Sequence, residues 1–219
     1  EAEILDLVRL EVREFVAGKH VVTATAQGVI KKTELMEYSR PRPGGIIAMG
    51  LNEGDQLIAT AITSRQDEIF LSTRHGMSIR FHEEDVRPMG RASVGVRGID
   101  LEEGDAVVGM EILHPQGTLL TVTENGFGKR TAIGEYRVQS RGGKGVITLK
   151  VTEKTGSIVG VTQVSETDEV MLVTDTGKII RLAVGELRVI GRNTQGVRLI
   201  GLQEDEHVAS LARLAEKEE

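Results

Sequence analysis

The chain has 219 residues, which is enough for one large domain or two small ones with a buried core. Its formal net charge is −6 and it contains no cysteine, which excludes disulfides and thiolate metal sites and fits a reducing compartment. No stretch approaches the roughly 18 consecutive apolar residues of a membrane span, and the N-terminus lacks a secretory pattern. We therefore expect a soluble cytoplasmic protein with no membrane partner.

Glycine and β-branched residues dominate the composition. The chain has 26 glycines and 4 prolines, with many Val, Ile and Thr and almost no long helical periodicity. Such a composition favours an all-β fold with many tight turns. Aromatic residues make up only 3% of the chain, which argues against a nucleic-acid site built from stacked rings.

The two ends differ from the rest of the sequence. Residues 4–12, ILDLVRLEV, alternate apolar and polar side chains as a half-buried strand does. We expect residues 1–14 to form the last strand of a preceding blade, and the chain to be a piece of something longer. Residues 215–219 are a charged tail that we expect to fray.

Between these ends the sequence repeats four times. Each copy opens with a short apolar run and then turns on a glycine, and successive turn glycines are 48, 50 and 51 residues apart. These glycines are Gly28, Gly76, Gly126 and Gly177. We therefore divide a single domain into repeat units at residues 15–64, 65–114, 115–165 and 166–214.

Each unit is predicted to contain four strands. The order is strand, glycine hairpin, strand, basic loop, strand, acidic turn and strand, and Asn125-Gly126 is the strongest of the hairpin signals. Four short antiparallel strands in about 50 residues are typical of a propeller blade. The predicted fold is all-β and propeller-like, with four-stranded blades.

Positive charge is concentrated in the turn and the basic loop of every unit. A cation stands four residues after each turn glycine, and an arginine stands four residues before a second glycine in every copy. Windows around these loops (28–42, 74–97, 126–150 and 177–198) hold 20 of the 27 Lys and Arg but only 7 of the 33 Asp and Glu. Because equivalent positions of a propeller share one rim, we predict a basic rim on an otherwise acidic protein.

Such a rim can hold double-stranded DNA by neutralising phosphates, without reading base edges. The candidate DNA-binding residues are Lys31, Lys32, Arg40, Arg42, Arg80, Arg91, Lys129, Arg130, Arg141, Lys144, Arg181 and Arg192. In the loop 139–145, missing side chains would let backbone amides approach phosphate oxygens. This loop consists of Gln139, Ser140, Arg141, Gly142, Gly143, Lys144 and Gly145. Two alternatives remain open: the charges are only a solvated face, or the rim of a propeller scaffold binds an acidic protein partner.

Signals for enzyme chemistry are weak. A nucleotide P-loop is excluded because Lys144 is followed by Gly145 rather than by Ser or Thr. The five histidines have no metal-binding spacing, and we expect each to have a surface or turn role. The acidic run Glu83-Glu84-Asp85 is expected to be solvated loop charge. We therefore predict no catalytic residue and no metal site in this chain.

Four segments of the sequence resemble one known family. They are GVIKKTEL from Gly28, DVRPMGRASVGVRGI from Asp85, LTVTENGFGKRT from Leu120 and GRNTQGV from Gly191. The sequence is similar to the C-terminal domain of DNA gyrase A over nearly its whole length, and less similar to the topoisomerase IV paralogue. The family's hallmark box, QRRGGKG, normally lies in the first blade. Here QSRGGKG lies in the third copy, with Ser140 at the position of an arginine.

The resemblance implies a β-pinwheel, a propeller variant whose blades exchange a strand with their neighbours, usually with about six blades. It implies a basic perimeter that wraps DNA, with contacts from Arg141 and Lys144. It also implies partners: the remainder of gyrase A together with gyrase B, in an A2B2 type IIA topoisomerase that uses ATP to introduce negative supercoils. The catalytic tyrosine and the sites for ATP and magnesium lie in other parts of that enzyme. This chain would then need no cofactor and would have no catalytic site of its own.

Overall fold

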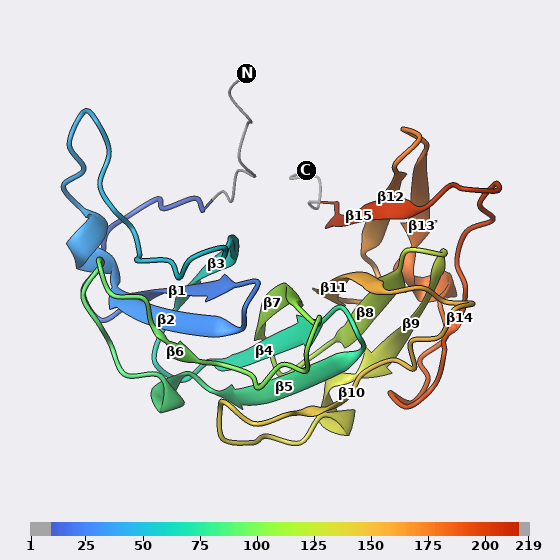
Figure 1. Cartoon of the computed structure of the whole chain (residues 1–219), viewed down its shortest axis with the longest axis horizontal. Coiled ribbons are helices and arrows are strands. Elements are labelled where there is room, and N and C mark those ends of the chain that lie inside the picture. The colour runs from blue at the N-terminus through green and yellow to red at the C-terminus, as the bar shows by residue number, and fades with distance from the viewer. Residues whose placement is uncertain (1–9, 215–219) are drawn as a thin grey trace.

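The computed structural model describes residues 10–214, which form fifteen strands and four short 3-10 helices in four consecutive units (Figure 1). The first unit holds β1 (His20–Thr25), β2 (Val29–Glu34), η1 (Leu35–Tyr38) and β3 (Leu57–Thr63). The second holds β4 (Glu68–Thr73), β5 (Met77–His82), η2 (Glu83–Asp85), β6 (Val96–Arg97) and β7 (Val107–Leu113). The third holds β8 (Thr118–Thr123), β9 (Phe127–Ala132), η3 (Ile133–Glu135), β10 (Val146–Ile147) and β11 (Ile158–Val164). The fourth holds β12 (Glu169–Thr174), β13 (Ile179–Ala183), η4 (Val184–Glu186), β14 (Val197–Arg198) and β15 (Val208–Arg213).

Neighbouring units exchange a strand. The sheets have the strand orders β3-β1-β2-β6, β10-β5-β4-β7, β11-β8-β9-β14 and β13-β12-β15, so each short strand β6, β10 and β14 completes the sheet of the unit before it. Every pairing in these sheets is antiparallel. The all-β, propeller-like prediction is confirmed, and the exchange is the one that defines a β-pinwheel.

Glycine permits the close approach that this exchange requires. Gly126 closes the β8–β9 hairpin with a φ of +76°, a conformation that residues with a Cβ atom rarely adopt. A Cβ atom added to Gly126 would lie 2.9 Å from the carbonyl oxygen of Ile200 in the next unit. The turn glycine therefore serves the hairpin and the junction between two units at once.

The hydrophobic core is divided among the junctions between sheets. One cluster joins Val22 and Ile30 of the first unit to Ile69 and Leu71 of the second, and equivalent clusters lie at the next two junctions. At the second junction the rings of Phe70 and Tyr136 meet edge to face, with centroids 5.0 Å apart. Each unit thus buries its apolar faces against its neighbours, as in repeat proteins.

The four units form an open arc, with the first and fourth units at its two ends (Figure 1). The strands β3, β7, β11 and β15 lie on the inner side of the arc and contact one another in that order. The strands β6, β10 and β14, with the loops around them, lie on the outer side. We call this outer side, from each 3-10 helix to the donated strand, the perimeter.

The predicted strand at residues 1–14 lies mostly outside the described residues, and residues 10–14 form no strand; the tail 215–219 is also outside them. The first unit was expected to have a strand in its basic loop, but residues 39–56 contain none. In the other units this segment becomes a strand by pairing with the preceding unit. None of the described helices is long and apolar enough to cross a membrane.

Candidate nucleic-acid interface

Four of the predicted DNA-binding cations are buried between units. Lys31 and Lys129 have no exposed surface, Lys32 is 4% exposed and Arg130 is 3% exposed. Their strands β2 and β9 are covered by the following unit, so the side chains point into a junction rather than into solvent. A phosphate cannot reach them while the units remain packed.

The two buried lysines hold the loop of the following unit. Lys31 Nζ donates to the carbonyl of Ala48 in its own unit at 2.7 Å and to that of Arg91 in the following unit at 2.5 Å. Lys129 Nζ donates to the carbonyl of Gly191 at 2.8 Å and also to that of Arg192. Burial lowers the pKa of each lysine to about 8, so both remain charged at neutral pH.

The cation four residues after the turn glycine reaches the 3-10 helix of the next unit. Arg80 Nη1 donates to the carbonyls of Ile133 and Tyr136 at 3.1 and 3.0 Å. Lys32 Nζ likewise donates to the carbonyl of Glu83 at 2.9 Å. The fourth member, Arg181, pairs with Glu169 in its own unit, and its side chain is 61% exposed. In three of the four units this recurrent charge is therefore a junction contact.

The arginine that precedes the second glycine is also a junction contact. Arg141 donates to the carbonyls of Asp85 and Arg97 at 2.8 and 3.0 Å, across to the preceding unit. Arg192 makes the same pair of contacts with the carbonyls of Glu135 and Ile147 at 3.0 and 2.9 Å. Arg91 reaches the carbonyl of Ile47 at 2.9 Å. These three guanidinium groups are half-buried, which leaves part of each at the perimeter.

The first junction also contains a buried histidine. His20 was expected at the surface and Glu83 in solvated loop charge, but they are 3% and 0% exposed. Their Nδ1 and Oε1 atoms are 3.4 Å apart, and Lys32 Nζ lies 3.5 Å from the same oxygen. Burial lowers the pKa of His20, which favours the neutral imidazole. This cluster belongs to the packing of the first two units.

The glycine-rich loop 139–145 is also occupied by contacts within the protein. The amide of Gly142 donates to the carbonyl of Gly98 at 2.6 Å, and Gly145 packs against the carbonyl of Ser78. The amide of Gly142 is therefore already used within the protein. Lys144 is exposed, as are Arg40 and Arg42 of the first unit. Arg40 and Arg42 line an open hollow of about 450 Å³ together with Arg91.

Three exposed arginines on the perimeter were missed. Arg87, Arg137 and Arg188 each follow a 3-10 helix and stand eleven residues after a turn glycine. All three are exposed, in contrast to the cations that hold the junctions. Their regular spacing was visible in the sequence, but it could not be separated from that of the buried cations. Each of the three junctions within residues 10–214 therefore carries one exposed arginine, and Lys144 adds a further exposed cation.

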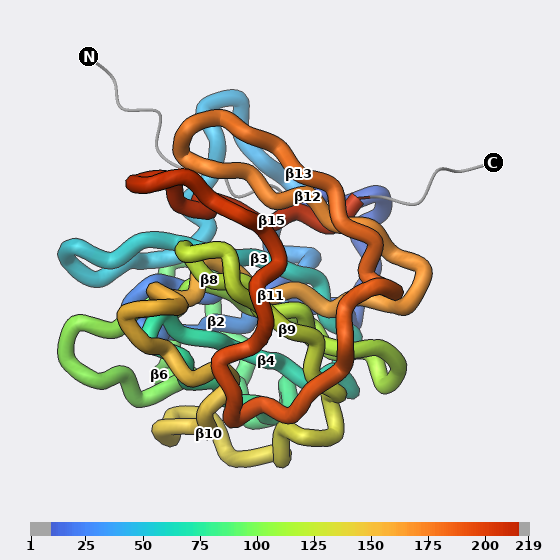
Figure 2. Tube along the Cα trace, turned by 90° about the vertical axis from the view of Figure 1, so that its right-hand side faces the viewer, coloured from blue at the N-terminus to red at the C-terminus, as the bar shows by residue number. Residues whose placement is uncertain are grey.

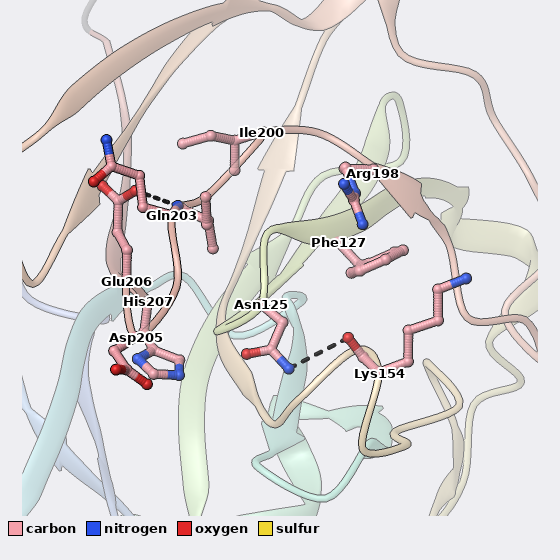
Figure 3. Close-up of a pocket in the computed structure, with 10 residues that line it drawn as sticks. Asn125, Phe127, Lys154, Arg198, Ile200, Gln203, Asp205, Glu206 and His207 are labelled. Carbon is pink, nitrogen blue, oxygen red and sulfur yellow. Dashed lines mark hydrogen bonds between the residues drawn. The ribbon is translucent and has the colours of Figure 1, made fainter.

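A second basic feature lies where the third and fourth units meet (Figure 3). Phe127 is flanked by Lys154, whose Nζ is 5.3 Å from the ring centre, and by Arg198, whose Cζ is 5.6 Å from it. They line a pocket of about 270 Å³ whose other wall carries Asp205, Glu206 and His207. Within the described part of the chain no group of three or more His, Asp or Glu could hold a metal ion.

Known proteins similar to this chain agree on one family. A family model described as "DNA gyrase C-terminal domain, beta-propeller" matches residues 19–64, 67–114, 117–165 and 168–215. The DNA gyrase A protein of Klebsiella oxytoca is 52% identical over 207 residues, and that of Escherichia coli K12 is 49% identical. Each alignment covers 94% of this chain but only 24% of the relative, so the chain spans about a quarter of those proteins.

Solved structures agree with the sequences. A structure of the DNA gyrase A C-terminal domain superposes with a TM-score of 0.84 at 27% identity, over 93% of this chain and 68% of that one. A crystal structure of the C-terminal domain of DNA topoisomerase IV gives 0.87 at 26% identity, over 93% and 64%. The chain therefore belongs to the family of DNA gyrase C-terminal domains, which are parts of type IIA topoisomerases.

Proposed function

We propose that this chain binds double-stranded DNA along its perimeter and bends it around the arc. The observation that carries the proposal is the recurrence of an exposed arginine at three successive junctions, Arg87, Arg137 and Arg188. The arc is curved with these loops on its convex side, so a duplex that follows them must bend (Figure 1). Phosphate neutralisation offsets the bending cost, which is of order 1–6 kcal/mol for a site of 20–30 bp.

The proposal extends to the assembly in which the domain acts. Within an A2B2 complex of gyrase A and gyrase B, the bent duplex would be presented to the strand-passage site, and the wrap would give an ATP-dependent supercoiling reaction its direction. In this proposal ATP and magnesium act elsewhere in the complex, which would work in the cytoplasm. The chain itself supplies phosphate contacts and curvature. It performs no chemistry.

The test is a salt series with DNA of two lengths. Binding to duplexes of about 20 and about 150 bp should be stronger for the longer one, and log K should fall linearly with log salt at about 0.9 per phosphate contacted. Replacing Arg87, Arg137 and Arg188 together by Ala should lower that slope by about 2.7. The matched control is Arg213→Ala, which removes one charge from the inner strand β15 and should leave the slope unchanged.

Either of two results would count against the proposal. Equal affinity for both lengths would exclude wrapping. If the triple substitution leaves the slope unchanged while the protein remains folded, the perimeter is not the DNA-binding surface. Binding to an acidic protein but not to DNA would favour the alternative of a propeller scaffold.

A further inference from the structure

Each exposed arginine of the perimeter is followed by an exposed apolar residue. Val138 and Val189 are 42% and 50% exposed, and Pro88 is exposed too. We call these dipeptides the perimeter pairs; they are Arg87-Pro88, Arg137-Val138 and Arg188-Val189. The strands β6 and β10, which follow two of the pairs, lie on the opposite side of the molecule from the inner strand β15 (Figure 2). A phosphate contact accounts for the arginine of each pair but not for its apolar partner.

An arginine of the preceding unit fixes the backbone on both sides of the second pair. Arg80 Nη1 donates to the carbonyl of Tyr136, the residue before the pair, at 3.0 Å. The amide of Gln139, the residue after the pair, donates to the carbonyl of Arg80 at 2.8 Å. The two hydrogen bonds hold the backbone of the pair against β5, while both of its side chains remain exposed.

The other two junctions repeat this arrangement in whole or in part. Arg130 donates to the carbonyl of Leu187 at 3.1 Å, and its own carbonyl accepts a hydrogen bond from the amide of Ile190 at 2.9 Å. At the first junction the amide of Met89 donates to the carbonyl of Lys32 at 2.8 Å. A backbone that is fixed before binding loses little conformational entropy when its side chains engage a ligand.

The arginines of the perimeter pairs are free to engage such a ligand. Within residues 10–214 their guanidinium groups make no hydrogen bond and no ion pair. A carboxylate stands two residues before each of them, at Asp85, Glu135 and Glu186, yet none of these carboxylates pairs with its arginine. Contacts within the described part of the protein therefore do not account for these three charges.

A bent duplex offers such a side chain its minor groove. In the proposed function the duplex bends toward the protein, and the minor groove narrows where it faces the inside of the bend. A narrow minor groove has an enhanced negative potential that attracts inserted arginines. The major groove is about 12 Å wide and admits a whole helix or a two-stranded ribbon, whereas a perimeter pair presents two single side chains.

The size of the apolar residues agrees with this direction of bending. Apolar side chains that wedge between base pairs from the minor groove kink the duplex toward its major groove, which bends it away from the protein. Val138 and Val189 are short, and the protein already covers part of each. They can pack against the sugars at the edge of the groove, but they do not reach between base pairs.

We propose that the arginine of each perimeter pair enters the minor groove of the bent duplex, while the apolar residue packs against the sugars at the edge of that groove. The inference rests on the proposed function, because it requires DNA to follow the perimeter. Guanine carries an amino group in the minor groove, whereas an A·T pair presents only acceptors there. The chain should therefore prefer A·T-rich to G·C-rich DNA without reading a particular sequence.

The test changes one groove at a time in a duplex of about 150 bp, which is one persistence length of DNA. Replacing every guanine by inosine removes the amino group from the minor groove, and replacing every thymine by uracil removes a methyl group from the major groove. The unsubstituted chain should bind the inosine duplex about fivefold more tightly than the ordinary one, the lower end of what one good base contact provides. The uracil duplex should bind as the ordinary one does.

Two sets of variants assign these effects to the perimeter pairs. Replacing the three arginines of the pairs by Ala should abolish the preference for inosine, whereas Arg213→Ala should keep it. Val138→Ser combined with Val189→Ser should weaken binding about tenfold, because less apolar surface is covered. The salt slope of this double variant should not change, since no charge is lost. Its control is Val16→Ser, which alters a valine that is 37% exposed outside the perimeter and should bind as the unsubstituted chain does.

Three results would overturn the inference and leave the proposed function standing. Equal affinity for the guanine and inosine duplexes, with the length and salt dependence intact, would exclude entry into the minor groove. A preference for inosine that persists after the arginines are replaced would come from the flexibility of the duplex. A double valine variant that binds as tightly as the unsubstituted chain would show that the apolar residues make no contact. A protein that bound none of these duplexes would instead overturn the proposed function, and this inference with it.

Discussion

The guanidinium of Arg130 donates a hydrogen bond to the carbonyl of Val184 at 2.8 Å, and this bond crosses from the third unit to the fourth. Arg130 is 3% exposed and also donates to the carbonyl of Leu187 at 3.1 Å. Its carboxylate partner, Glu166 at 2.6 Å, belongs to the segment that leads into the fourth unit. A cation that resembles a phosphate ligand in the sequence thus holds the fold together.

Arg130→Met should destabilise the protein by about 3 kcal/mol, because three carbonyl and carboxylate acceptors at the junction lose a charged donor. Arg181→Met is the matched control, since it changes the same position in the last unit, where the side chain is 61% exposed. That change should cost no more than about 0.5 kcal/mol. Urea unfolding followed by circular dichroism measures both.

A DNA-binding measurement on Arg130→Met and Arg181→Met can contradict the junction role of Arg130. If Arg130→Met kept its stability but weakened DNA binding more than Arg181→Met does, the buried guanidinium would have to be reachable by phosphate, and the assignment to the junction would be wrong.

Gly145→Ala should cost about 2–4 kcal/mol, because it combines a positive φ of +78° with a collision between Cβ and the carbonyl of Ser78. Gly142→Ala has the same φ, but its Cβ would lie 3.4 Å from the nearest atom, so we expect a loss of about 1 kcal/mol. Thermal unfolding of the two variants compares them directly. Equal losses would mean that the loop glycines serve only the turn, and that the exchanged strand does not require one.

The pKa of Lys129 predicts a pH dependence of stability. Its folded-state pKa is about 8 and its ordinary value is 10.5, so between these values the unfolded chain binds more protons. The free energy of unfolding contributed by Lys129 therefore rises with pH across this window, by at most about 1.4 kcal/mol per pH unit. Below pH 8 both states are protonated and the contribution is constant.

Lys129→Met should remove that rise. The difference in the free energy of unfolding between the unsubstituted chain and the variant should therefore shift in favour of lysine as the pH increases from 8 to 10. Lys144→Met, which removes a lysine from an exposed position, is the control variant. Parallel curves for Lys129→Met would show that the buried ammonium titrates at its ordinary pKa.

The all-β architecture and the four units were determined by the sequence alone. A turn glycine such as Gly126 fixes a positive φ wherever it occurs, and the alternation of side chains along a strand is a local property, so both can be read without a neighbour. The number of units follows from their spacing. The exposed perimeter arginines recur with the same regular spacing, so their positions could also have been predicted from the sequence.

Only the tertiary structure decided which cations are buried. Arg80, Arg130 and Arg181 occupy one position in three consecutive units, yet Arg130 is enclosed and Arg181 is open to solvent. The difference lies in the unit that follows, whose 3-10 helix supplies the carbonyl acceptors more than 50 residues farther along the chain. Burial is a property of what packs against a residue rather than of the residue and its near neighbours. The repeat therefore revealed where charge recurs, while the junctions between units determined whether that charge holds the protein together or faces a partner.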